Sequence, residues 1–252
     1  FELSLCPDAA LQAATFKVMS QQYSQRADLA RNLRQVQLLC SKDDVEFFQL
    51  AKSMLSSIKG FLNGPREELD ETKCAENVQK AWSELEMART VELRQSYQRL
   101  FKNVQFPQAV IEVVEVSVLE DEHRSETGMH TPRFKLLTKC YMFLLACCKG
   151  NTEIKNDRVF ADNMGMFVDH LDVKPFPEGA THTVDVMASD LVLELYQDNK
   201  PLVASVNSQL ISRFVSLIVN NGRLPTWLQF LNKIAVVGDG VGDAVVGDGG
   251  GD

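Results

Sequence analysis

Residues 131–150 read TPRFKLLTKCYMFLLACCKG and carry the local signals of a well-specified α-helix. Thr131 can cap the first turn, and Pro132 suits the first helical position because proline has no N–H to donate there. Apolar side chains then recur every three or four residues from Phe134 to Cys148, before Lys149-Gly150 ends the pattern. The stretch therefore predicts an amphipathic helix that needs a packing partner for its apolar face.

The same periodicity recurs along the chain, and alternating, strand-like stretches are nearly absent. Residues 43–62 form one apolar face, with Ser41 and Asp44 placed as a capping box and Asn-Gly-Pro at 63–65 as a stop. Residues 110–119 are rich in valine and could be a strand. Because no partner strand is evident, we predict a helix there.

The second half of the chain predicts further helices. Asn156 can cap one whose apolar face runs from Phe160 to Leu171, and another covers 184–195. Pro201 opens a helix that reaches Leu217, and a last one follows Pro225. Helix pairs thus repeat about every forty residues, which favours an all-α, armadillo-like helical solenoid of stacked helix pairs. A compact helical bundle would show much the same rhythm.

We divide the chain into four parts on this pattern. Residues 1–64 hold the first helical repeats, residues 65–90 form a polar insertion or surface helix, and residues 91–237 continue the same solenoid. Residues 238–252 are a Gly/Asp-rich tail. Glycine turns and aspartate oxygens are what a calcium loop requires, but the tail has no terminal glutamate of an EF-hand and no repeated nonapeptide, so a flexible tail is the preferred interpretation.

Composition narrows the classes of partner. The 252 residues carry a net charge of −8, which disfavours nucleic acids and anionic membranes and favours protein partners. No apolar run is long enough to span a bilayer, so we expect no direct membrane insertion by this segment. The six cysteines show no Cys-x-x-Cys spacing and fall mostly on apolar helix faces, as free thiols in a reducing compartment do.

The sequence contains none of the motifs typical of metal sites, catalytic sites or nucleotide-binding sites. His123, His130, His170 and His182 have no metal-ligand spacing, and solvated or helix-capping roles are favoured for them. The carboxylates at 112–122 read as a solvated face, and no nucleophile elbow, phosphate loop or dinucleotide fingerprint occurs. We therefore expect that the chain is not an enzyme and that it holds no catalytic residue, no metal and no cofactor.

Several short stretches resemble a known family. Tyr23-Ser24-Gln25-Arg26 and, nine residues after Arg26, Gln35-Val36-Gln37-Leu38-Leu39 are similar to the Phe-Ser-Gln-Arg and Gln-Val-Gln-Leu-Leu run of inositol trisphosphate receptors. That run lies in a helical homology domain shared in general form with ryanodine receptors. The stretches 98–103, 110–114 and 228–231 follow in the family's order. Residues 65–87 match poorly, and the Gly/Asp tail has no counterpart.

The resemblance implies a central, armadillo-like, non-catalytic segment of a homotetrameric calcium-release channel, on the cytosolic face of the endoplasmic reticulum membrane. The expected partners are neighbouring domains and subunits and regulatory proteins, and the expected role is to relay ligand binding to the pore and offer docking surface. A free-standing scaffold that binds peptides or proteins in a groove is the alternative.

Three residues are candidates for partner contact. Gln25 and Arg26 lie where the resemblance is concentrated, at the junction of two predicted helices, although Arg26 could instead satisfy helix-end carbonyls or pair with Asp28. Trp227 starts a helix after Pro225 and could anchor an interface, with core or groove packing as the alternative.

Overall fold

The computed structural model describes residues 17, 41–64, 70–119, 132–172, 187–221 and 227–232. Helices make up most of these residues, and no strand occurs among them. The prediction of an all-α protein is confirmed. Contacts divide the chain into a unit of residues 1–45 and a unit of residues 46–252, and each is described by itself.

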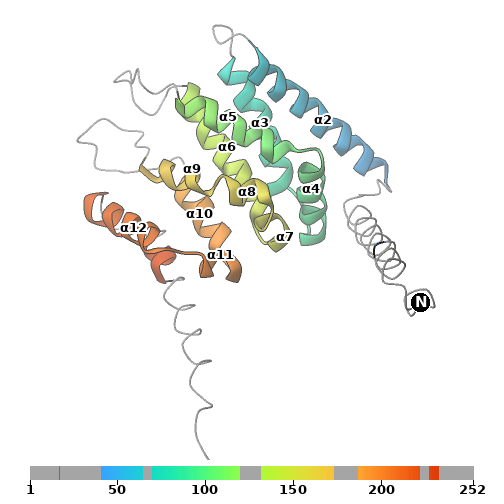
Figure 1. The fold of residues 1–252 in the computed structure, drawn as a ribbon. Helices are drawn as coiled ribbons and strands as arrows, with labels where there is room; N and C mark the ends of the chain where they lie inside the picture. The colour runs from blue at the N-terminus through green and yellow to red at the C-terminus, as the bar shows by residue number, and fades with distance from the viewer. Residues whose placement is uncertain are drawn as a thin grey trace, which may run out of the picture. The chain divides into compact units, whose positions relative to one another are not determined.

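The helices are labelled in Figure 1. They are α2 (Lys42–Asn63), α3 (Glu71–Glu86), α4 (Val91–Asn103), α5 (Phe106–Leu119), α6 (Pro132–Cys148), α7 (Thr152–Lys155), α8 (Arg158–Asp162), α9 (Met164–Asp169), the 3₁₀ helix η5 (His170–Asp172), α10 (Ala188–Tyr196), α11 (Lys200–Ala204) and α12 (Ser208–Asn221). Residues 227–232 are also helical. The valine-rich stretch at 110–119 lies in α5, so its prediction as a helix is confirmed.

Helix α2, whose first residues belong to the first unit and whose remainder belongs to the second, begins with the predicted capping box. The backbone N–H of Asp44 donates to Ser41 Oγ at 3.0 Å, and the N–H of Ser41 donates to Asp44 Oδ2 at 3.1 Å. These two bonds satisfy N–H groups that have no partner within the helix. The helix ends at Asn63, at the predicted stop.

In the second unit, α6 is the central helix. Nine of its 17 residues are buried, and they lie on more than one face. A helix that is apolar nearly all round must be covered on several sides. Accordingly, α6 packs against α3, α5 and α10.

The segment 65–90 contains α3, which begins after Asp70. The Asp70 side chain accepts from the N–H of Lys73 at 2.9 Å, which is an N-cap bond. The narrow apolar stripe of this helix is buried and consists of Cys74, Val78, Ala81 and Leu85. Because α3 packs along α6, this stripe contributes to the helical core.

Aromatic rings join helices that are distant in sequence. Phe47 of α2 stacks on Tyr97 of α4, with ring centroids 3.7 Å apart. Phe101 of α4 meets Phe143 of α6 edge-on at 5.3 Å, and Phe214 of α12 stacks on Phe230 at 3.8 Å. Each pair buries large apolar surface and prefers a defined geometry, so the pairs fix how these helices pack.

Two predicted helices are wrong in their extent. The face from Phe160 to Leu171 is divided among α8, α9 and η5. Asn156 is the C-cap of α7, and Asp157 caps α8 by accepting from the N–H of Val159 at 3.1 Å.

The helix predicted from Pro201 to Leu217 is likewise two helices, α11 and α12. Asn207 Oδ1 accepts from the N–H of Leu210 at 2.9 Å, so an asparagine cap starts α12. The apolar period continues across the break, which is why periodicity alone predicted one helix.

Candidate protein-docking site

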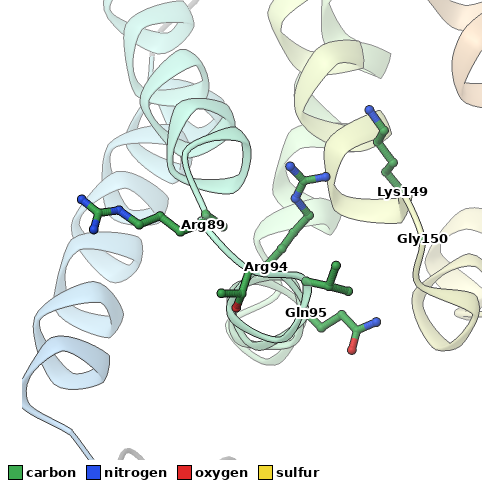
Figure 2. Close-up of a pocket in the computed structure, with 8 residues that line it drawn as sticks. Arg89, Arg94, Gln95, Lys149 and Gly150 are labelled. Atoms are coloured by element: carbon green, nitrogen blue, oxygen red, sulfur yellow. The ribbon is translucent and has the colours of Figure 1, made fainter.

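A pocket of about 300 Å³ lies where the α3–α4 turn approaches the C-terminal end of α6 (Figure 2). Its lining comes from two segments far apart in the sequence: Ala88, Arg89, Thr90, Val91, Arg94, Gln95, Lys149 and Gly150. The pocket is open to solvent, so its side chains are accessible to a partner.

Local caps fix the two backbone segments of the pocket. Thr90 Oγ1 accepts from the N–H of Leu93 at 3.1 Å and so begins α4. Gly150 has φ +68°, the left-handed conformation that ends helices and that glycine adopts without a Cβ clash. The N–H of Gly150 donates to Glu194 Oε1 at 3.2 Å, which attaches this turn to α10.

The pocket is basic although the chain is acidic. Its lining includes Arg89, Arg94 and Lys149 and no carboxylate, whereas the whole chain has 34 acidic and 26 basic residues. Among the described residues, none of these three side chains takes part in an ion pair. In Figure 2 Arg94 and Lys149 both extend upward in the view, and Arg89 extends to the left, away from them.

Backbone carbonyls that would repel an anion near the pocket already accept hydrogen bonds. Arg94 Nε donates to the carbonyl of Leu85 at 3.2 Å. Gln98 is fully buried, and its Nε2 donates to the carbonyls of Ala146 at 2.9 Å and Lys149 at 3.0 Å. These bonds reduce the negative potential at the C-terminal ends of α3 and α6.

The same region holds polar ties between helices. Asn151 Nδ2 donates to Gln98 Oε1 at 3.0 Å, and Asn151 Oδ1 caps α7. Lys155 Nζ lies 2.6 Å from Glu194 Oε1, with side chains 3% and 15% exposed. The α6–α7 segment is therefore bonded to α4 on one side and to α10 on the other.

A further tie runs from α4 to α7 and α8. Lys102 Nζ lies 3.2 Å from Glu153 Oε1 and 3.0 Å from Asp157 Oδ2. Burial lowers the pKa of Lys102, but its hydrogen bonds and charge attraction to Asp157 and Glu153 outweigh that effect and leave the pKa raised. At neutral pH this lysine is therefore charged and holds both carboxylates.

The cysteine thiols in the described part of the chain are buried. Cys74, Cys140, Cys147 and Cys148 are free and buried, and burial raises the pKa of Cys147 to about 12. A protonated, inaccessible thiol is a poor nucleophile. No group of three or more metal-binding side chains occurs within the described ranges.

His170 is buried rather than solvated. Tyr141 Oη and His170 Nδ1 are 2.6 Å apart, and the histidine is also the C-cap of α9. Burial lowers the pKa of His170, and the neighbouring Asp169 partly opposes this. The helix-capping role considered for this histidine is observed.

The candidate contact residues fall in different places. Gln25 and Arg26 lie outside the described residues, as do His123, His130, His182 and the Gly/Asp tail. Trp227 is 2% exposed, and its Nε1 donates to Ser189 Oγ of α10 at 2.6 Å, so its side chain packs in the core here. Sequence reasoning missed Arg94 and Lys149 because no local signal brings α4 and the end of α6 together.

No helix in the described part of the chain is long and apolar enough to cross a bilayer. In comparisons with known proteins, the chain matches the RIH domain family over residues 53–246. Over 142 residues it is 28% identical to the inositol 1,4,5-trisphosphate receptor itr-1 of Caenorhabditis elegans. The aligned part is 56% of this chain and 4% of that receptor, so the chain spans a small part of its relative's length.

Proposed function

The chain belongs to the RIH domain family of inositol trisphosphate and ryanodine receptors, and from this premise we propose that it is a non-catalytic coupling segment of an intracellular calcium-release channel. In this role it relays ligand binding to the pore and offers docking surface to regulatory proteins. Its partners are neighbouring domains and subunits of a homotetramer on the cytosolic face of the endoplasmic reticulum membrane.

The observation that carries the proposal is the set of polar ties around α6. Gln98 and Asn151 bond α4 to the α6–α7 turn, and Lys155 and Glu194 bond α7 to α10. Because a packed helix pair with fixed hydrogen bonds moves as a unit, a displacement of α4 reaches α10 through this turn. Helix α6 packs against α3, α5 and α10, so it contacts both helices that precede it and a helix that follows it in the chain.

The test places variants in the full-length parent channel. Lys102→Ala removes the tie from α4 to α7 and α8, and Lys135→Ala removes an exposed lysine of α6 as the matched control. Calcium release from permeabilised cells is measured at saturating inositol 1,4,5-trisphosphate, with channel assembly checked on native gels. We expect Lys102→Ala to change the open-to-closed equilibrium about twofold to thirtyfold and to lower maximal release.

Unchanged maximal release from an assembled Lys102→Ala channel contradicts the coupling role. The competing function is a free-standing scaffold that binds peptides in a groove, and the basic pocket is the observation in its favour. Sequencing the parent reading frame distinguishes the channel segment from the scaffold, because a channel requires membrane-spanning segments encoded in the same frame.

A further inference from the structure

We infer that the pocket at Arg94 and Lys149 is a docking site for an acidic polypeptide segment that also carries apolar side chains. The inference deepens the docking role proposed above and rests on it. It names the chemistry of the partner and the residues that recognise it.

Charge complementarity selects an acidic partner. Arg89, Arg94 and Lys149 line the pocket without a carboxylate among them, on a chain whose net charge is −8. A local basic site on an acidic molecule attracts an anion while the rest of the surface repels it. Thr90 and Val91, the N-cap and first residue of α4, place the positive end of that helix dipole in the same lining.

The three cationic side chains do not all extend in the same direction, which favours a segment with several carboxylates over a single anionic group. Arg94 and Lys149 extend to one side, while Arg89 extends away from Lys149 (Figure 2). A single phosphoryl group held by Arg94 and Lys149 would leave Arg89 without a contact. An extended acidic chain can place one carboxylate against Arg94 and Lys149 and another against Arg89.

Two exposed apolar side chains add the second element of recognition. Met87 is 66% exposed and Val91 is 67% exposed, and the two residues flank the turn that carries Arg89. Covering these two side chains would remove apolar surface from water and would therefore contribute to binding. Apolar residues spaced between the carboxylates would meet Met87 and Val91.

The test measures binding of a fluorescein-labelled peptide of glutamate pairs separated by single leucines to the 252-residue chain. Fluorescence anisotropy is compared for this peptide, a version with glutamine for glutamate, and a version with serine for leucine. We expect the glutamate peptide to bind, the glutamine version to lose binding, and the serine version to bind more weakly. Raising the salt concentration should weaken binding because the charges are exposed.

Variants locate the site. Arg89→Ala/Lys149→Ala removes two exposed cations of the pocket, and Lys135→Ala/Arg158→Ala removes two exposed cations elsewhere. Lys135 is matched to Lys149 because it is an exposed lysine of α6, 14 residues before Lys149 and therefore about 21 Å away along the helix. We expect the pocket variant to weaken the peptide affinity about threefold to thirtyfold and the control variant to leave it unchanged.

Three results would overturn the inference: absence of binding by the glutamate peptide, equal binding of the glutamine version, or equal loss in the two double variants. An oligonucleotide of equal charge that binds as tightly would also overturn it, because the site would then be selective for charge alone. The peptide assay contains no channel, so its failure leaves the coupling role standing. Conversely, unchanged release from the Lys102→Ala channel would contradict the coupling role and say nothing against peptide binding.

Discussion

Replacing Gln98 with leucine removes the polar connection between α4 and the end of α6. Its side chain makes three hydrogen bonds, to Ala146, Lys149 and Asn151, at 2.9, 3.0 and 3.0 Å. Leucine would leave the Ala146 carbonyl and Asn151 Nδ2 without these partners in a buried site, at about 1–3 kcal/mol each. The apolar side chain regains about 1–2 kcal/mol by its own burial. We therefore expect the free energy of unfolding to fall by about 3 kcal/mol.

The assay is urea unfolding of the 252-residue chain followed by circular dichroism. A loss of this size lowers the melting temperature by about 6–12 °C for a domain of this length. The matched control is Gln95→Leu, at a half-exposed glutamine one turn earlier in α4. It should change stability by less than about 0.5 kcal/mol.

A double-mutant cycle with Asn151→Ala isolates the shared bond. Asn151→Ala also removes the cap of α7, where Asn151 Oδ1 accepts from the N–H of Ile154 at 3.2 Å. Because both variants break the bond between Gln98 and Asn151, the double variant should lose less than the sum of the two. Strict additivity, or a Gln95→Leu variant as unstable as Gln98→Leu, would refute the reasoning.

Three further predictions concern the same helices. Glu194→Ala should lower the free energy of unfolding by about 3 kcal/mol in urea unfolding, because it leaves Lys155, 3% exposed, as a buried charge without a counter-ion and with only the Gln197 carbonyl as acceptor. Burial lowers the pKa of His170 below 6.5, so the unfolded chain binds this proton first as the pH falls. Stability should therefore decline below about pH 6.5, down to the pKa of the folded state, and His170→Gln should remove that decline in unfolding curves at several pH values. Gly150→Ala should destabilise the fold by about 1 kcal/mol because the φ angle of Gly150 is +68°. Gly60→Ala, within α2 and with open space around it, should stabilise the fold by about 0.5–1 kcal/mol. If the calorimetric melting temperatures of the two variants move in the same direction, this pair of predictions is contradicted.

Features encoded within a few residues could be predicted from the sequence. The capping box of Ser41 and Asp44, the glycine stop at Gly150 and the helical state of α5 depend on neighbouring residues or on a repeated apolar period. These signals are strong because each satisfies a helix-end group or fits one backbone conformation. The all-helical fold followed from them.

Helix breaks were harder to predict because the apolar period continues across them. Asp157 and Asn207 each cap a new helix through a side-chain oxygen, and neither is preceded by a glycine or followed directly by a proline. An aspartate or asparagine inside an apolar stripe has two uses, as a solvated helical residue or as a cap, and the choice depends on tertiary packing. The predicted helices were therefore too long at these positions.

The candidate site could not be predicted because its residues meet only through tertiary packing. Gln98 and the carbonyls of α6 are separated by 48 and 51 residues, and their pairing depends on how α4 crosses the end of α6. That crossing places Arg94 beside Lys149 and also ties the α6–α7 turn to α10 through Glu194. A segment that docks on Lys149 would therefore contact the turn through which α4 and α10 are joined, and its binding would favour whichever arrangement of the two helices places Arg94 and Lys149 closer together. Docking and coupling thus depend on the same turn, and a partner can regulate the relay only as far as its affinity differs between those arrangements.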